Sequence, residues 1–187
     1  MRRGSGLGGR AHREIRARSF GSGRENPCGL HVRAREVEGG FRATYRPQPH
    51  HAGFPQALHG GITAALLDEV MAYPASRPLG RFVATRELHV WYDRPVPMDR
   101  PIVIDAWLES AGADRFVVAG ELCAERGRPL ARGRAVYRRL PDDRVAAFLG
   151  PRATRRVVPP SPRAARPGPA APSAKRRSRA APRPRRG

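Results

Sequence analysis

The sequence predicts an α+β fold in which an antiparallel sheet wraps around one long central helix. The helix is predicted by residues 59–73, which are rich in helix-forming residues and apolar on nearly every side. A helix of that kind is buried rather than placed on a surface. The sheet is predicted by stretches of alternating apolar and polar residues before and after the helix. Strands with one apolar face need cover, and the central helix supplies it.

Two strands are expected before the helix. Residues 29–38 alternate in part, and residues 41–45 alternate fully. Pro47 and Pro49 end the second strand, because proline cannot donate to a strand ladder. Residues 47–58 are rich in Pro, His and Gly and are expected to form a loop that leads into the helix.

Four strands are expected after the helix, separated by turns that contain Pro or Gly. They cover residues 82–93, 102–109, 116–124 and 130–139. Consecutive strands joined by short turns predict an antiparallel meander. Alternation along the first of the four places Thr85 and Leu88 on opposite faces.

The helix combines a glycine-rich start with an acidic centre. It begins at His59-Gly60-Gly61, where small residues leave the N–H donors of the first turn open at the positive end of the helix dipole. Asp68 and Glu69 lie in its middle, and Pro74 is expected to end it. A carboxylate in an apolar helix is costly unless it has a partner or a function. We expect a salt bridge or a dimer contact for Glu69 and a catalytic function for Asp68.

Helix geometry separates the two features. Gly60 and Asp68 are eight residues apart, which corresponds to ~12 Å along a helix axis. One reacting carbonyl group cannot contact both Gly60 and Asp68 of the same chain. If both residues serve one reaction, a two-fold dimer must place the glycine end of one helix beside the acid of the other.

The charge of the chain is concentrated at its ends. The formal net charge of the 187 residues is +20. Residues 1–25 hold seven Arg and two Glu, a net +5, and residues 151–187 hold eleven Arg, one Lys and no acid, a net +12. We expect a disordered basic N-terminal tail at 1–25, one domain at 26–140 and a disordered Arg/Pro/Ala-rich tail at 141–187. No aromatic residues are interleaved in residues 151–187, so nucleic acid is expected to bind weakly at most, through the tails.

Several classes of protein are not expected. Two cysteines, Cys28 and Cys123, do not make a disulfide framework, and a cytoplasmic location is expected. No apolar run reaches ~18 residues, and the basic N-terminus lacks the apolar core of a secretory signal, so no membrane partner is expected. His50, His51 and His59 lack the spacing of zinc ligands, so we expect no metal and no cofactor. A Gly-x-Ser-x-Gly nucleophile motif is absent, which disfavours a serine hydrolase of that type.

Four short motifs resemble the acyl-CoA thioesterases of the phenylacetate-degradation type. They are Asn26-Pro27-Cys28-Gly29-Leu30, His51-Ala52-Gly53-Phe54-Pro55, His59-Gly60-Gly61 and Leu66-Leu67-Asp68-Glu69. The similarity covers about residues 26–140, and the expected order of elements matches the hotdog fold of that family. The resemblance implies an acyl-CoA substrate and a homodimer or a dimer of dimers.

The resemblance also implies functions for individual residues. A glycine N–H at the helix start, from Gly60 or Gly61, would hold the thioester carbonyl. Asp68 would activate water or attack the carbonyl directly, His59 would shape the site and Thr85 would help to place the water. This chemistry agrees with backbone donors that stabilise an oxyanion and a carboxylate that acts as base or nucleophile.

The loop before the helix is expected to contact the substrate. Some relatives carry an Asn there, and in this chain Gly53 falls near that position. The resemblance therefore assigns substrate binding to His51, Gly53 and Phe54.

Two alternatives to a thioesterase stay open. A hotdog hydratase or dehydratase would pair a histidine, His51 or His59, with Asp68. A non-catalytic acyl-CoA-binding module would use the same groove without turnover, with the basic tails on anionic partners.

Overall fold

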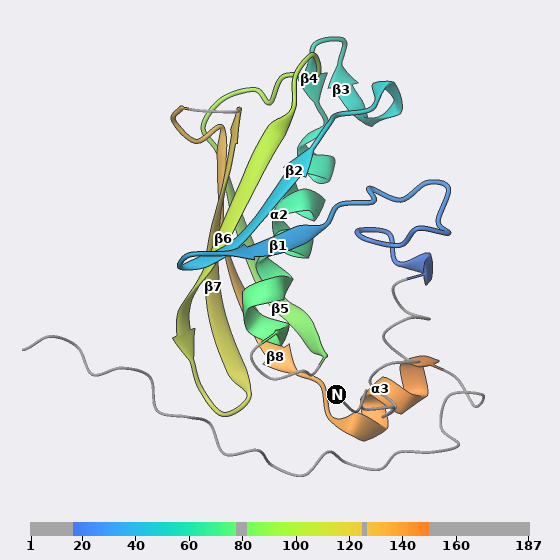
Figure 1. Cartoon of the computed structure of the whole chain (residues 1–187), viewed down its shortest axis with the longest axis vertical. Helices are drawn as coiled ribbons and strands as arrows, with labels where there is room; N and C mark the ends of the chain where they lie inside the picture. The colour runs from blue at the N-terminus through green and yellow to red at the C-terminus, as the bar shows by residue number, and fades with distance from the viewer. Residues whose placement is uncertain (1–16, 78–81, 125–126, 150–187) are drawn as a thin grey trace, which may run out of the picture.

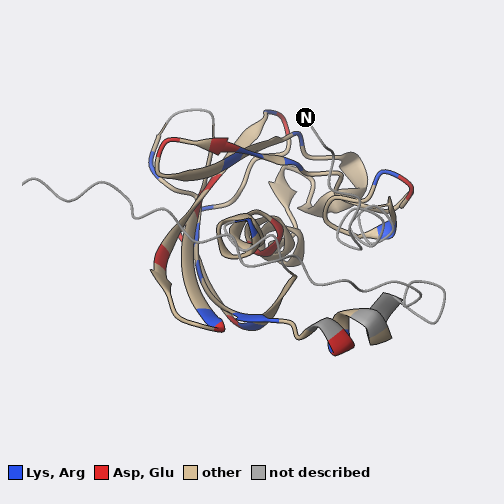
Figure 2. Cartoon of the chain, turned by 60° about the horizontal axis from the view of Figure 1, so that its bottom comes forward, with Lys and Arg blue, Asp and Glu red and all other residues tan. Residues whose placement is uncertain are grey.

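A six-stranded antiparallel sheet curves around helix α2 (Gly60–Ser76) in the computed structural model, which describes residues 17–77, 82–124 and 127–149 (Figure 1). The strand order is β1-β2-β6-β7-β8-β5. The strands are β1 Ala34–Val37, β2 Gly40–Tyr45, β5 Val83–Tyr92, β6 Ile102–Ala111, β7 Arg115–Ala124 and β8 Ala131–Arg139. The view of Figure 2 shows α2 nearly end-on inside the curve of the sheet. The predicted α+β hotdog fold is confirmed.

The pairing of the strands differs from the predicted meander. Strands β6, β7 and β8 are consecutive neighbours, but β5 pairs with β8 at one edge, and β6 pairs with β2. The prediction of a four-stranded meander is therefore wrong. Alternation shows which face of a strand is buried and carries no information about which strand lies beside it. The observed order places β1–β2 and β5 at opposite edges, so that the sheet surrounds the helix from both sides.

Helix α2 is longer than its sequence predicted. Pro74 lies inside the helix, which ends at Ser76, so the prediction that Pro74 stops it is wrong. Proline in a helix forfeits one backbone hydrogen bond. Here the loss falls in the last turn, where Pro74 and Ala75 are buried and the N–H of Arg77 still donates to the carbonyl oxygen of Tyr73 at 2.9 Å.

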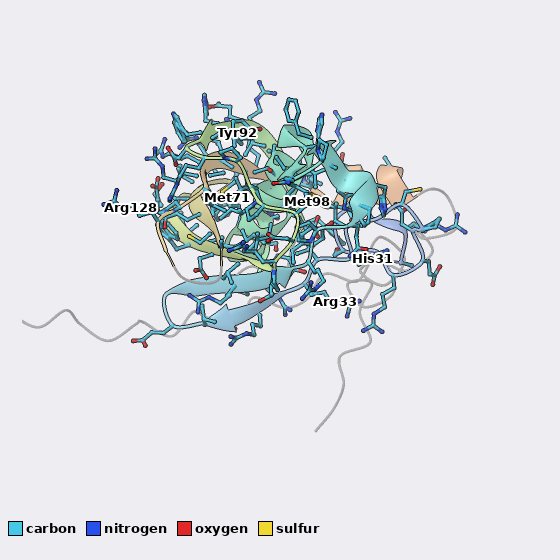
Figure 3. All side chains as sticks on the ribbon, turned by 90° about the horizontal axis from the view of Figure 1, so that it is seen from above. His31, Arg33, Met71, Tyr92, Met98 and Arg128 are labelled. Carbon is cyan, nitrogen blue, oxygen red and sulfur yellow. The ribbon has the colours of Figure 1, made fainter. Side chains whose placement is uncertain are left out.

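A notch of two glycines receives the side chain of Met71. Gly120 on β7 and Gly133 on β8 are paired across the two strands, and Met71 of α2 lies against both. Figure 3 labels Met71 among the side chains in the middle of the molecule. A Cβ added to Gly120 would lie 2.9 Å from Met71 Cγ and 3.0 Å from the carbonyl oxygen of Asp105. Both glycines therefore allow the helix to approach the middle of the sheet closely.

The loop before α2 contains structure that its sequence did not predict. Residues Pro49–His51 form a 3-10 turn, and β3 (Ala52–Phe54) pairs with β4 (Ala57–Leu58) as a small hairpin. The hairpin lies at the N-terminal end of α2 (Figure 1) and is held by a 2.8 Å hydrogen bond from the Leu58 N–H to Val96. Strands of three and two residues are too short to produce a recognisable alternation.

The structure describes residues beyond both ends of the expected domain. Gly21 and Gly23 are buried, and the N–H of Val32 donates to the carbonyl oxygen of Gly21 at 2.9 Å. The structure thus places residues 17–25, which we expected in the N-terminal tail, against the domain. Helix α3 (Asp142–Leu149) follows β8. The rest of the expected tails, 1–16 and 150–187, lies outside the described residues.

Charged side chains on the outer face of the sheet pair with one another. Arg42–Asp105 at 2.6 Å joins the neighbouring strands β2 and β6, and Arg132–Asp93 at 2.8 Å joins β8 to the end of β5. Arg134–Glu109 at 2.7 Å reaches from β8 across β7 to β6. Exposed pairs of this kind contribute little to stability, about 0–1 kcal/mol each.

Among the described helices, none is long and apolar enough to cross a bilayer.

The glycine notch predicts unequal costs for two similar substitutions. Gly120→Ala should lower the free energy of unfolding by about 1–3 kcal/mol, because the new methyl group meets the Asp105 backbone as well as Met71. Gly133→Ala should cost less, since its nearest atom is the flexible end of Met71, at 2.9 Å, and alanine reduces the entropy of the unfolded chain. Urea denaturation of both variants measures the difference. Equal stabilities would contradict the packing described here.

Candidate active site

The first turn of α2 leaves one backbone donor free. His59 caps the helix, and its Nδ1 accepts a hydrogen bond from the Gly61 N–H at 3.0 Å. The N–H groups of Ile62 and Thr63 both donate to the His59 carbonyl oxygen at 3.0 Å. None of the described residues accepts a hydrogen bond from the Gly60 N–H. Of the two glycines that the sequence offered as an oxyanion donor, Gly60 is therefore the one whose N–H is available.

Tyr92, at the end of β5, contacts the same glycine. Its hydroxyl donates to the Gly60 carbonyl oxygen at 3.0 Å, and the residue is 55% exposed. A Cβ on Gly60 would meet the Tyr92 ring at 3.6 Å, an ordinary contact. Sequence analysis did not single out Tyr92, because alternation gave no sign that the end of β5 meets the start of the helix.

The three loop residues expected to bind substrate occupy different environments. His51 is 6% exposed, and its carbonyl oxygen accepts from the His59 N–H at 2.9 Å. Gly53 lies against His59: a Cβ there would be 3.0 Å from His59 Cα. Phe54 is 75% exposed at the hairpin. The hairpin thus brings His51 and Gly53 to the start of the helix, while Phe54 points its ring into solvent.

The His51 ring is tied to the sheet. Its Nδ1 forms a hydrogen bond with the hydroxyl of Tyr45, a buried residue of β2. Burial lowers the pKa of His51, and the charge of His50 lowers it further. Burial also raises the pKa of Tyr45 to about 12. Both rings are therefore neutral near neutral pH, and together they fix the loop that carries His59.

A second group of residues surrounds Asp68. Its Oδ1 accepts a hydrogen bond from Thr85 Oγ1 at 2.8 Å and another from the Tyr137 hydroxyl at 2.9 Å. The Tyr137 hydroxyl also lies 2.8 Å from the Asp68 carbonyl oxygen. No described Arg or Lys pairs with this half-buried carboxylate, and no described residue hydrogen-bonds to Oδ2. One carboxylate oxygen is held by two donors, and the other has no hydrogen-bond partner among the described residues and is not fully buried.

A β-bulge brings Thr85 to this group. Thr85 is paired with Tyr137, and Glu87 with the next residue back, Val136, so Arg86 is an extra residue in β5. An extra residue reverses the alternation beyond it. Thr85 and Leu88 therefore both face α2, and the prediction that they lie on opposite faces is wrong.

Tyr137 is the residue of this group that sequence analysis missed. It lies on the buried face of β8 and is 1% exposed. Burial, followed by the charge of Asp68, raises the pKa of Tyr137 well above its ordinary value, so its hydroxyl stays protonated. A buried tyrosine hydroxyl needs a partner. That requirement could have indicated Tyr137 in the sequence, with the carboxylate of Asp68 on the helix as the candidate partner of its hydroxyl.

Glu69 acts on the second group through its charge, which contributes to the raised pKa of Tyr137. Glu69 lies against the N-terminal segment, where a Cβ on Gly21 would come within 1.9 Å of its Oε2. Cys28 is exposed, while burial raises the pKa of the Cys123 thiol. No three His, Cys, Asp or Glu side chains of the described ranges gather as metal ligands.

The family model of the thioesterase superfamily matches residues 56–131 of this chain. That stretch contains the whole of α2 and most of the sheet, and therefore His59, Gly60, Asp68 and Thr85. Tyr137 lies beyond it. No curated protein matches the chain.

Solved structures share the fold. One is a thioesterase superfamily protein with 27% identity and a TM-score of 0.56; the match covers 62% of this chain and 60% of that one. A putative thioesterase from Ralstonia eutropha JMP134, described as phenylacetic acid degradation-related, is 23% identical with a TM-score of 0.56 and coverages of 67% and 98%. A Bacillus halodurans protein solved with CoA is 23% identical with a TM-score of 0.56 and coverages of 73% and 90%. At 23% identity the last two establish the fold alone.

The buried His51 predicts a pH-dependent loss of stability. Because its pKa is lowered in the folded protein, the unfolded chain takes up a proton first, near the ordinary histidine pKa of about 6.5. Stability linked to His51 is therefore complete above that pH and is lost as the pH falls toward the lower pKa of the folded state. His51→Gln should flatten the decline in urea midpoint between pH 7 and pH 5. His89→Gln, an exposed histidine of β5, is the control and should keep the wild-type slope.

Proposed function

We propose that this protein hydrolyses acyl-CoA thioesters to a free acid and a thiol. The observation that carries the proposal is the Asp68 carboxylate: it lies in a mostly apolar helix, two hydroxyl groups hold its Oδ1, and its Oδ2 has no hydrogen-bond partner among the described residues. The free N–H of Gly60 begins the same helix. The superfamily match supports thioester chemistry, and the CoA bound to the Bacillus halodurans protein supports a CoA thioester as substrate.

The Gly60 N–H would stabilise the charge that develops on the thioester carbonyl oxygen. Water attacks the carbonyl carbon while Asp68 takes up a proton from that water, and the resulting tetrahedral oxyanion accepts a hydrogen bond from Gly60. When the intermediate collapses, the C–S bond breaks, and the departing sulfur takes the proton back from Asp68. In the nucleophilic alternative Asp68 itself attacks, the thiolate leaves, and water cleaves the acyl-aspartyl anhydride.

The proposed site needs two chains. Gly60 and Asp68 lie ~12 Å apart along α2, too far for one carbonyl group to contact both. Strand β5 is an edge of the sheet, and it carries the exposed aromatic residues Trp91 and Tyr92. An exposed strand edge is a template for pairing with a second chain. We propose that a homodimer, alone or within a dimer of dimers, brings Gly60 of one chain to Asp68 of the partner subunit.

The local contacts give less support to a hydratase. His59 Nδ1 is used by the Gly61 N–H, and His51 is buried against Tyr45, so neither histidine contacts Asp68 within the chain. A dimer with a histidine beside Asp68 would retain that alternative. A phenylacetate-degradation-type specificity is the finer proposal, supported by the motifs before and within α2.

A panel of aryl and alkyl acyl-CoAs tests the proposed reaction. Wild-type protein should release thiol, and Asp68→Asn should lower kcat by about 100-fold or more, the usual scale for losing acid–base help. Asp105→Asn on the outer face of the sheet is the matched control and should retain the wild-type rate. Wild-type turnover of an enoyl-CoA, seen as lost ultraviolet absorbance, or binding without thiol release would contradict the proposal.

Mixed dimers test the two-chain site. Gly60→Pro removes the free N–H with little local strain, because Pro is accepted at the first helical position and His59 already has the extended backbone, ψ 135°, that precedes proline. Gly60→Ala keeps the N–H and serves as its control. Homodimers of Asp68→Asn or of Gly60→Pro should be nearly inactive. A mixed dimer has one site with both defects and one with neither, so it should recover about half the wild-type rate. Verified mixed dimers that stay inactive would exclude a site shared between chains.

A further inference from the structure

The hydroxyl of Tyr137 is a second donor to the oxygen that Thr85 already contacts. Thr85 donates to Asp68 Oδ1 at 2.8 Å, and the single hydroxyl proton of Tyr137 is shared between Oδ1 at 2.9 Å and the Asp68 carbonyl oxygen at 2.8 Å. The two residues are direct partners across β5 and β8, so the sheet itself fixes their spacing. A carboxylate with two donors on one oxygen has a defined plane and a defined free oxygen.

The two donors differ in exposure. Thr85 is exposed at the edge strand, whereas Tyr137 is 1% exposed in the core. Water can replace a hydrogen bond from an exposed threonine. It cannot reach the buried tyrosine, so the orientation of Asp68 relies on Tyr137. The phenol stays protonated because burial and the Asp68 charge both oppose its ionisation.

A purely structural explanation for the hydroxyl is incomplete. The Tyr137 ring belongs to the core cluster, and its hydroxyl could be satisfied by the Asp68 carbonyl oxygen alone, at 2.8 Å. The hydroxyl lies within reach of Oδ1 as well. The position between backbone and carboxylate oxygens ties the side chain of Asp68 to its own helix.

We propose that Tyr137 is a positioning residue: with Thr85 it holds Oδ1 of Asp68, so that Oδ2 is the oxygen that acts on the thioester. This proposal rests on the proposed function for the reaction itself. In the general-base route, Oδ2 takes the proton of the attacking water. In the nucleophilic route, Oδ2 forms the bond to the carbonyl carbon. Tyr137 contacts neither substrate nor water in either route and acts through Asp68.

Tyr137→Phe removes the hydroxyl and keeps the ring. We expect kcat to fall about 10- to 100-fold, because a misoriented carboxylate loses alignment, while KM changes less than about two-fold. Tyr73→Phe on α2, a buried tyrosine whose ring packs on Phe41, is the matched control and should keep the wild-type kcat. A loss in kcat that is equal in both variants would assign the effect to general destabilisation and overturn the proposal.

A double-mutant cycle separates positioning from a general effect on the fold. In the Asp68→Asn background, adding Tyr137→Phe should cause no further fall in kcat, since the hydroxyl works only through the carboxylate. An additional fall of the same size as in wild type would contradict the proposal. If wild-type protein releases no thiol at all, the proposed function fails.

A crystal structure of Tyr137→Phe supplies a readout that does not depend on turnover. The Asp68 carboxylate should lose its single orientation and occupy a second rotamer or rotate away from Thr85. An unchanged carboxylate would overturn the positioning proposal even if the thioesterase reaction is established. A reoriented carboxylate with no thioesterase activity in wild-type protein would support the positioning and contradict the reaction.

Discussion

The structure depends on the burial of one helix that must also carry polar groups. Leu66, Leu67, Val70 and Met71 of α2 are completely buried, and strands from both halves of the sheet cover them. Any polar side chain on this helix needs a partner from a strand or from the helix itself. Thr63 contacts the His59 carbonyl oxygen, and Asp68 receives hydroxyl groups from two strands. The sheet therefore serves as the hydrophobic cover and also as the source of hydrogen-bond donors.

Much of the fold could be predicted because the pattern of the sequence records burial. An apolar helix flanked by alternating strands allows few arrangements, and the central helix within an antiparallel sheet follows from it. Pairing order could not be predicted in the same way. Strand β5 follows the helix in the chain but lies beside the last strand, β8. Nothing in the residue pattern of β5 indicates which strand it pairs with. The expected end of the helix at Pro74 was wrong because a proline costs little in a last turn that is held by burial.

The sequence indicated single residues of the candidate site but not the contacts between them. Asp68, Thr85 and Gly60 were identified from a buried acid and a glycine-rich helix start together with a family resemblance. Alternation alone places Thr85 and Leu88 on opposite faces of β5. The extra residue Arg86 puts both on the face toward α2, where Thr85 contacts Asp68. Tyr137 was missed because its sequence position shows only a buried aromatic residue. The buried environment of His51 also required the fold, since it depends on Tyr45 from a distant strand.

The cap made by His59 has a consequence for how a substrate would be oriented. Because the His59 ring uses the Gly61 N–H, the helix start presents one donor instead of a converging pair. A single N–H fixes the distance of a carbonyl oxygen but leaves the acyl group free to rotate about the hydrogen bond. The remaining orientation must come from contacts with the parts of the substrate on either side of the thioester. In such a site, binding energy from those remote groups is expressed in the rate of reaction as well as in affinity.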